Sequence, residues 1–257
     1  MGDGRQAGRR WRRRLRRVIA LIGPKSHIGP KSHSHDYYEV LRRLHSDLRP
    51  RTYLEIGIRD GDSLALARGA AAVIGIDPNP LLDPPPGPNE RIFAMTSDEF
   101  FASHDVREEF GGRDLDLAFI DGMHLFEYVL RDFANVERSA TPDTLAVLHD
   151  CLPRSAATAA RERATLMWTG DVWKAVFVLL RYRPDLRLTV IDARPSGLVL
   201  VRGLNPESRV LDDNAERIAT EFTDLGFEYW EEHRGEVLAL VEDLETALAR
   251  FDGDSAT

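Results

Sequence analysis

The stretch Tyr53–Ser63, YLEIGIRDGDS, decides the fold of this chain. Its first half continues a short apolar run that starts at Thr52, and its second half holds Gly57 and Gly61. A helix-like stretch, Leu64–Ala70, follows. A buried strand, a tight turn and a helix in this order form one βα unit, and the glycines let the turn bend sharply and approach a ligand. The stretch therefore predicts an α/β domain with a ligand site at this turn.

Similar apolar runs recur along the chain, each bounded by turn residues. They occur at Thr52–Ile58, Ala72–Asp77, Arg91–Thr96, Leu115–Asp121, Thr144–His149, Leu186–Ile191 and Gly197–Val201. Runs that are apolar throughout predict strands buried on both faces, as in a mostly parallel sheet with helices on each side. The last two runs are joined only by Asp192–Ser196, which is too short for a parallel crossover and predicts an antiparallel hairpin at the sheet edge. We expect a Rossmann-like, doubly wound sheet of seven strands, followed by C-terminal helices from Asn214 onwards.

Charge divides the 257 residues into two unlike parts. The net charge is −8, but residues 1–31 carry +9 and the remaining residues carry −17. We expect a basic arm and linker at 1–35, the sheet domain at 36–205, and a helical extension at 206–257 that acts as a cap or forms a homo-oligomer. The acidic body disfavours nucleic acid as a partner. The single cysteine, Cys151, excludes an internal disulfide framework and a multi-cysteine zinc site, and we expect it to be a buried, inert thiol.

The basic arm has two interpretations. Its core, GRRWRRRLRRVIALIG at Gly8–Gly23, is a solvated tail or a segment whose residues 9–22 bind an anionic membrane surface. In the second case Trp11, Leu15 and Val18–Ile22 would enter the interface. This apolar run is shorter than a signal peptide or a transmembrane helix requires. We therefore expect a cytoplasmic protein, with peripheral membrane attachment as the alternative to a free tail.

Reactive side chains follow the predicted strands. Ligands of open α/β sheets bind beyond the carboxyl ends of the strands. The candidates there are Glu55, Gly57, Gly61 and Ser63 at the first strand, Asp77 at the second, Ser97 at the third, Asp121 and His124 at the fourth, and His149 and Asp150 at the fifth. Asp77, Ser97 and His124 could instead cap turns or helices. Carboxylates and histidines at two adjacent strand ends nevertheless indicate a charged ligand.

The first strand end also indicates the kind of cofactor. The dinucleotide fingerprint GxGxxG is absent, because Arg59 and Asp62 occupy its later glycine positions. Glu55 would repel a pyrophosphate but suits a cationic ligand, such as one with a sulfonium and an amino group. An NAD-dependent oxidoreductase is thus a disfavoured alternative. A non-catalytic cofactor-binding protein recruited by the basic arm is another.

The chain resembles the class I S-adenosylmethionine-dependent methyltransferases from about Tyr38 to Gly203. Within them it is most similar to the small-molecule O-methyltransferase group that includes antibiotic-sugar methylases and cephalosporin-hydroxylase-like proteins. The motifs that carry the resemblance are YLEIGIRDGDS (53–63), VIGID (73–77), LAFIDGMHLFEYVLRD (117–132) and LAVLHD (145–150).

The resemblance implies a role for each strand end. Glu55, Gly57 and Gly61 would surround the methionine part of S-adenosylmethionine, and Asp77 its ribose, while Asp121 would lie beside the methyl donor. In metal-dependent members the residue that matches Asp121 ligates Mg²⁺ together with a pair of carboxylates that ends the next strand. In this chain His149 and Asp150 stand at the positions of that pair. Because only one of this pair is a carboxylate, and Met123 replaces a further acid of the family motif, a metal and a metal-free reaction both stay open.

Methyl transfer to a hydroxyl requires removal of a proton. His124 is the candidate base in the absence of a metal, because an imidazole titrates near neutral pH, and Asp121 is second. We expect the acceptor to be a hydroxylated small molecule, either a sugar or a glycosylated metabolite. The segment 151–171 would form a lid, in which Trp168, like Trp173 just beyond it, stacks on the acceptor or packs in the core.

Overall fold

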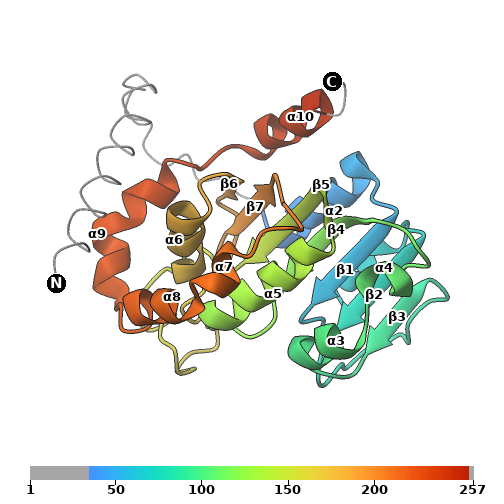
Figure 1. Ribbon diagram of the computed structural model, residues 1–257, viewed down its shortest axis with the longest axis horizontal. Helices are drawn as coiled ribbons and strands as arrows, with labels where there is room; N and C mark the ends of the chain where they lie inside the picture. The colour runs from blue at the N-terminus through green and yellow to red at the C-terminus, as the bar shows by residue number, and fades with distance from the viewer. Residues whose placement is uncertain (1–34, 255–257) are drawn as a thin grey trace. The chain divides into compact units, whose positions relative to one another are not determined.

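The computed structural model describes residues 35–254 (Figure 1). The proposed membrane-binding segment 9–22 and the rest of the arm up to residue 34 lie outside the described residues. The strands are β1 (Thr52–Ile56), β2 (Ala72–Ile76), β3 (Glu90–Phe93), β4 (Leu115–Ile120), β5 (Ala140–His149), β6 (Arg187–Ile191) and β7 (Leu198–Arg202). The helices are α2 (Tyr37–Leu48), the 3₁₀ turn η1 (Leu64–Ala67), α3 (Ser97–Ser103), α4 (Val106–Glu109), α5 (Phe126–Arg138), α6 (Trp173–Tyr182), α7 (Val210–Asp213), α8 (Ala215–Phe222), α9 (Phe227–Leu238) and α10 (Leu244–Asp254).

The strands form one seven-stranded sheet in the order β3-β2-β1-β4-β5-β7-β6. β1 to β5 pair with one another in parallel, and β7 runs antiparallel to both β5 and β6. This confirms the predicted doubly wound sheet with an antiparallel hairpin at its edge. The chain builds outward from β1 to β3 and then returns to place β4 on the other side of β1. The strand order therefore reverses between β1 and β4, which is where ligands bind in such sheets.

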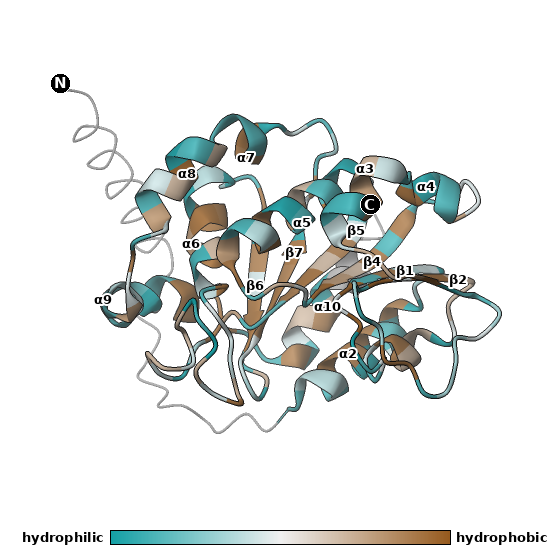
Figure 2. Cartoon of the chain, turned by 90° about the horizontal axis from the view of Figure 1, so that it is seen from below, coloured by the Kyte–Doolittle hydropathy of each residue, from teal (hydrophilic) through white to brown (hydrophobic). Residues whose placement is uncertain are grey.

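Helices cover both faces of the sheet. Leu54 and Ile56 of β1 belong to an apolar cluster with Phe133 of α5 and residues of α3 to α9, whereas Tyr53 belongs to a second cluster with Leu44 of α2 and residues of η1 and α10. Figure 2 shows the apolar strands between these two helical layers. The alternation of side chains along β1 sends successive residues into different clusters. Burial on both faces explains why the strands read as continuous apolar runs.

The helix boundaries follow local chemistry and differ from the predictions in places. Asp36 caps α2 by accepting a hydrogen bond from the Tyr38 amide (2.8 Å), and Thr96 caps α3 in a reciprocal pair with Glu99. The helix expected at Leu64–Ala70 is only the short 3₁₀ turn η1. β5 begins four residues earlier than predicted, and its pairing with β4 shifts register there.

The C-terminal helices pack on the sheet domain. Phe222 of α8 and Trp230 of α9 join the cluster on one face, and Leu244 of α10 joins the cluster on the other. The separation of an extension at 206–257, and its use in a homo-oligomer, stay predictions. Within residues 35–254, no helix has the length and apolar composition needed to cross a membrane.

The loops after β1 and β4 touch at a glycine. Gly57 has a φ of +87°, and a Cβ atom built there would lie 2.1 Å from the carbonyl oxygen of Asp121. Any side chain at this position would therefore force the Asp121 loop away from the β1 loop. The sequence requires glycine here for conformational and for steric reasons.

We expect Gly57→Ala to lower the free energy of unfolding by about 2 kcal/mol or more, because both the strain and the backbone clash act against the folded state. Urea unfolding followed by circular dichroism measures this change. Gly69→Ala is the matched control, because a Cβ at Gly69 meets no atom within 4 Å. Equal midpoints for the two variants would show that the loops after β1 and β4 do not depend on this contact.

Candidate active site

The candidate residues come together where β1, β4 and β5 end. Ile56 of β1 lies beside Ile120 of β4, which lies beside Leu148 of β5. The residues that follow these positions therefore emerge at one edge of the sheet. Two carboxylates and two histidines gather there, namely Asp121, His124, His149 and Asp150.

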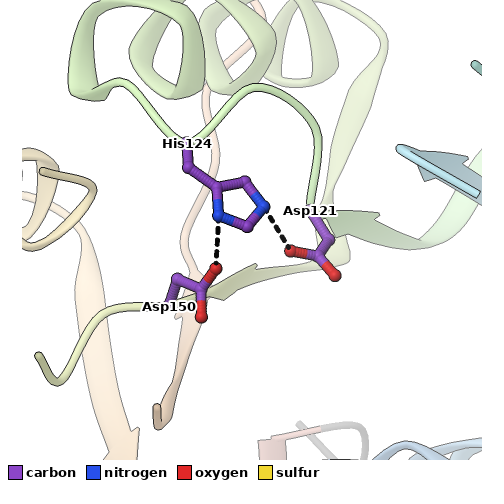
Figure 3. A group of neighbouring side chains, drawn as sticks. All are labelled: Asp121, His124 and Asp150. Atoms are coloured by element: carbon purple, nitrogen blue, oxygen red, sulfur yellow. Dashed lines mark ion pairs between the residues drawn. The ribbon is translucent and has the colours of Figure 1, made fainter. Parts of the chain in front are cut away.

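His124 is held by Asp150. Its Nδ1 atom lies 2.9 Å from Oδ2 of Asp150 and 2.8 Å from the carbonyl oxygen of Trp168, while its Nε2 atom faces Oδ1 of Asp121 at 3.7 Å (Figure 3). Both neighbours of Nδ1 are acceptors, so we assign the proton of the neutral ring to Nδ1. Nε2 then has a free lone pair. An imidazole oriented by a carboxylate in this way is suited to act as a general base.

His149 pairs with the other carboxylate. Its Nδ1 donates to Oδ1 of Asp121 (2.9 Å), and its Nε2 lies 3.4 Å from Oγ of Ser196, whose hydroxyl donates to Asp150. The ring of Tyr37, at the start of α2, packs against the imidazole with a centroid distance of 4.4 Å. Each carboxylate of the site thus has one histidine within hydrogen-bond distance, Asp121 with His149 and Asp150 with His124.

Charge sets the protonation of the two histidines. Burial lowers the pKa of His149, but the charges of Asp121 and Asp150 outweigh it and raise the pKa to about 9. Burial also lowers the pKa of His124, and the hydrogen bond and charge of Asp150 reverse this so that the net shift is upward. His149 is therefore cationic at neutral pH and neutralises part of the acidic edge, whereas His124 titrates above the ordinary range of histidine.

The site has the wrong donors for Mg²⁺. Asp121, His124 and Asp150 each offer one atom, all within 4.8 Å of one another. Mg²⁺ prefers oxygen ligands in octahedral geometry, and only two of these residues supply oxygen. Oδ1 of Asp121 already accepts from His149, and both oxygens of Asp150 accept from His124 and Ser196. The predicted ligand set also included His149, which here binds Asp121 instead. The magnesium site at Asp121, Asp150 and His149 stays a prediction.

Glu55 is buried, and both oxygens of its carboxyl group accept hydrogen bonds. Tyr53 donates its hydroxyl to one oxygen (2.8 Å), Ser63 donates to the other (2.5 Å), and Glu55 is 0% exposed. Burial raises the pKa of Glu55 to about 8, against the lowering effect of these two hydrogen bonds. The carboxyl group joins β1 to the start of η1 and lies beneath the glycine turn. A cation bound at that turn would lower the pKa and favour the carboxylate.

The remaining predicted cofactor residues lie around the same turn or farther away. Asp77 accepts hydrogen bonds from the amides of Arg59 (2.8 Å) and Asn79 (2.7 Å), so it ties the turn after β1 to the turn after β2. Gly61 has a φ of +82°. Ser97 begins α3 and hydrogen-bonds the buried carboxyl of Asp132. The structure does not bring Ser97 into the cluster of histidines and carboxylates.

The segment between β5 and α6 covers His124, in keeping with the expected lid. The indole of Trp168 stacks on the imidazole with a centroid distance of 5.1 Å and an interplanar angle of 12°. Gly170, with a φ of +55°, passes so close to the His124 carbonyl that a Cβ would lie 1.7 Å away. Asp171 accepts from the Phe126 amide (3.0 Å) and caps α5 in place of His124. Trp173, by contrast, is 1% exposed and packs in the core.

Three contributors were not found from the sequence. Ser196 lies in the turn of the β6–β7 hairpin, Tyr37 lies at the start of α2, and Asp171 is the last residue of the expected lid. None belongs to a motif at a strand end. Cys151 is fully buried, as predicted, and its Sγ donates to the carbonyls of Leu148 and His149.

Comparison with known proteins finds a family that matches the central segment of the chain. A family of methyltransferase domains matches residues 54–151, from β1 to the end of β5. The segment contains every strand-end residue discussed above, and the match confirms the resemblance to methyltransferases. No curated protein matches the chain.

Several solved structures are similar to the chain. An O-methyltransferase from Bacillus cereus in complex with SAH shares 13% identity, with 75% of this chain and 90% of that chain covered and a TM-score of 0.48. A putative O-methyltransferase from Klebsiella pneumoniae shares 15% sequence identity with this chain. The similarity covers 72% of this chain and 86% of that chain, with a TM-score of 0.48. An O-methyltransferase from Streptomyces achromogenes, which is involved in tomaymycin synthesis and was solved in complex with SAM, shares 15% sequence identity. The similarity covers 66% of this chain and 80% of that chain, with a TM-score of 0.48.

The burial of Glu55 predicts a pH-dependent cost to stability. A folded-state pKa of about 8, against an ordinary value of 4.5, means that the folded chain binds this proton more tightly than the unfolded chain. The contribution of Glu55 to stability therefore falls as pH rises from about 4.5 to about 8. Glu55→Gln keeps a polar group at the site but cannot ionise. We expect it to gain up to about 4 kcal/mol relative to the unchanged chain between pH 5 and pH 8.5.

Chemical unfolding at a series of pH values without added ligand measures this difference. Glu232→Gln, on the exposed surface of α9, is the control for loss of one carboxylate. A difference between Glu55→Gln and the unchanged chain that stays constant with pH would show that Glu55 is ionised in the folded protein throughout this range.

Proposed function

We propose that this chain, whose residues 54–151 match a methyltransferase domain, transfers a methyl group from S-adenosylmethionine to a hydroxyl of a small molecule. The acceptor in this proposal is a sugar or a glycosylated metabolite. The observation that carries the proposal is the Asp150–His124 pair, in which Asp150 orients the imidazole and leaves Nε2 free at the edge of the sheet. The acidic strand ends around it suit a cationic cofactor.

The cofactor would lie across the ends of β1, β2 and β4. Its methionine part would contact the turn that contains Gly57, Gly61 and Ser63, above the buried Glu55. Its ribose would approach Asp77, and its adenine the start of α3 at Ser97. The sulfonium would then lie near Asp121, where a negative charge favours it.

The reaction follows from the free nitrogen of His124. The acceptor hydroxyl donates its proton to Nε2 while its oxygen attacks the methyl carbon in line with the sulfur. With S-adenosylmethionine bound, this attack would break its carbon–sulfur bond and leave the electron pair on sulfur, so that the products would be a methyl ether and S-adenosylhomocysteine. The imidazolium that forms lies between Asp150 and Asp121, and both carboxylates stabilise it. Trp168 and the segment around Gly170 exclude water from one side of the ring.

Magnesium is the alternative means of activating the hydroxyl. It would be held by Asp121 and Asp150, with His149 or His124 as a third ligand, but the donor set argues against it. We therefore expect that prior dialysis against EDTA leaves the rate of methyl transfer unchanged and that added Mg²⁺ restores nothing. Loss of activity on chelation, with full recovery on addition of Mg²⁺, would contradict the metal-free mechanism.

Replacement of the base tests the proposed function. With radiolabelled S-adenosylmethionine and a panel of sugars and glycosides, we expect the unchanged chain to methylate at least one acceptor. With that acceptor, His124→Ala should lower kcat by about 10²- to 10⁴-fold and leave the affinity for S-adenosylhomocysteine within about twofold. Unchanged kcat would exclude His124 as the base, and a second variant, Asp121→Ala, then tests the other candidate.

The pH profile tests the role of Asp150. Because the base must be neutral, kcat should rise with pH through the pKa of His124, which lies above the ordinary value of 6.5. Asp150→Asn removes the charge that raises this pKa, so the rise should move to lower pH. Asparagine is the suitable replacement because position 150 has a φ of 61°, which it tolerates. A profile that does not move would show that Asp150 does not set the protonation of the base.

A further inference from the structure

Arg161, in the middle of the lid (residues 151–171), joins the lid to α5. Its two terminal nitrogens donate to the two carboxyl oxygens of Glu127, in the first turn of α5. Nη1 also donates to Oδ2 of Asp171 (2.6 Å), at the end of the lid. A guanidinium that binds both oxygens of a carboxylate is fixed in distance and in orientation. One side chain thus connects the middle of the lid to its end and to the helix that follows His124.

Asp171 does not need Arg161 to balance its own charge. Asp171 and Lys174 are each 1% exposed, and Nζ of Lys174 lies 2.9 Å from Oδ2 of Asp171. The other oxygen of Asp171 accepts from the Phe126 amide (3.0 Å). A buried carboxylate with a buried cation and a backbone donor is already satisfied. Arg161 is therefore a second cation at Asp171, and it brings with it the partly exposed Glu127. The effect left for this extra pair is the attachment of the lid.

The attached part of the lid carries Trp168, which contacts the proposed base. The indole Nε1 of Trp168 donates to the carbonyl of Ala160 (2.6 Å), the residue directly before Arg161. The indole ring stacks on the imidazole of His124, and the carbonyl oxygen of Trp168 lies 2.8 Å from its Nδ1. A continuous series of contacts therefore runs from the guanidinium to the imidazole. The position of Arg161 sets that of Trp168, and Trp168 sets the orientation of His124.

The lid supplies much of what holds His124 in place. Asp150 binds Nδ1 from the end of β5, but the stacked ring and the second acceptor of Nδ1 belong to Trp168. The amide of Asp171 donates to the carbonyl of His124 (3.2 Å). A lid that moved away from α5 would leave the imidazole with Asp150 alone. Proton transfer is sensitive to such a change, because a displacement of about 1 Å can lower a rate about 100-fold.

We propose that Arg161 is a positioning residue for methyl transfer, which holds the lid on α5 so that Trp168 keeps His124 in its productive orientation. The inference rests on the proposed function, in which His124 accepts the proton of the acceptor hydroxyl. Arg161 acts through Trp168 and takes no part in the proton transfer itself. Both residues lie beyond the segment 54–151 that matches the methyltransferase family, so the attachment belongs to the lid of this chain. Its loss should affect turnover and leave cofactor affinity unchanged.

A double-mutant cycle on kcat tests the pair, with the acceptor that the panel of sugars and glycosides identifies. Arg161→Gln should lower kcat about tenfold, because the lid loses both carboxylate contacts and the base is displaced. Glu127→Ala should lower it less, about threefold, because Asp171 still binds Arg161. The double variant should be no slower than Arg161→Gln alone, since both changes remove the same contact. Arg163→Gln is the matched control, because this guanidinium donates to the carbonyl of Leu166 within the lid (3.4 Å), and its kcat should not change.

Two further measurements separate positioning from a general loss of stability. Calorimetric titration with S-adenosylhomocysteine should give affinities within about twofold of the unchanged chain for all these variants, since none of the contacts removed lies at the proposed cofactor turn. Hydrogen exchange followed by mass spectrometry should show faster exchange at residues 155–168 in Arg161→Gln, with β1 and β4 exchanging as in the unchanged chain.

The outcomes separate the inference from the function on which it rests. If the unchanged chain methylates no acceptor, the proposed function fails and the inference fails with it. If the unchanged chain is active and Arg161→Gln keeps its kcat, the inference alone is overturned. Faster exchange in all strands of Arg161→Gln would attribute a lower kcat to global destabilisation and would overturn it as well. Arg161→Lys, which keeps the charge but not the planar fork, provides a second variant if Arg161→Gln does not fold, and its kcat should be intermediate.

Discussion

The approach of the β1 loop to the β4 loop at Gly57 is the constraint on which the rest of the site depends. The Asp121 amide donates to the carbonyl of Ile56 (2.9 Å), and the Gly57 amide donates to the carbonyl of Ile76 (2.8 Å), so pairing continues beyond the ends of the strands. Only a residue without a Cβ lets Asp121 lie this close to the turn. The same contact that closes the sheet edge also sets the distance between the proposed cofactor turn and the acid–base group.

A second constraint is the balance of charge at that edge. Asp121 and Asp150 lie at neighbouring strand ends and would repel each other if both were ionised without partners. His149 donates to Asp121 and His124 to Asp150, so each carboxylate accepts from one imidazole and the two rings remain oriented. Glu55 differs from these two carboxylates, because it accepts hydrogen bonds from hydroxyl groups and not from a histidine. Its burial therefore favours the neutral acid. A cationic cofactor would complete this balance.

The sequence allowed most of the fold to be predicted, because the signals were local. Continuous apolar runs indicated strands buried on both faces, and the short Asp192–Ser196 connection indicated the terminal hairpin. The positions of Asp121, His124, His149 and Asp150 at one edge followed from the parallel order. Their pairing could not be predicted, because it depends on side-chain directions and on Ser196, which lies 46 residues after Asp150. The packing of Trp168 on His124 and the capping of α5 by Asp171 likewise arise only when the lid folds over β4 and β5.

The identity of the cofactor is the central claim, and equilibrium binding tests it most directly. Titration of the full chain with S-adenosylhomocysteine and, separately, with NAD⁺ measures both affinities under one set of conditions. The turn after β1, which lacks the GxGxxG fingerprint, predicts saturable one-to-one binding of S-adenosylhomocysteine and no detectable binding of NAD⁺. Tight binding of NAD⁺ with none of S-adenosylhomocysteine would contradict the account and favour the oxidoreductase alternative.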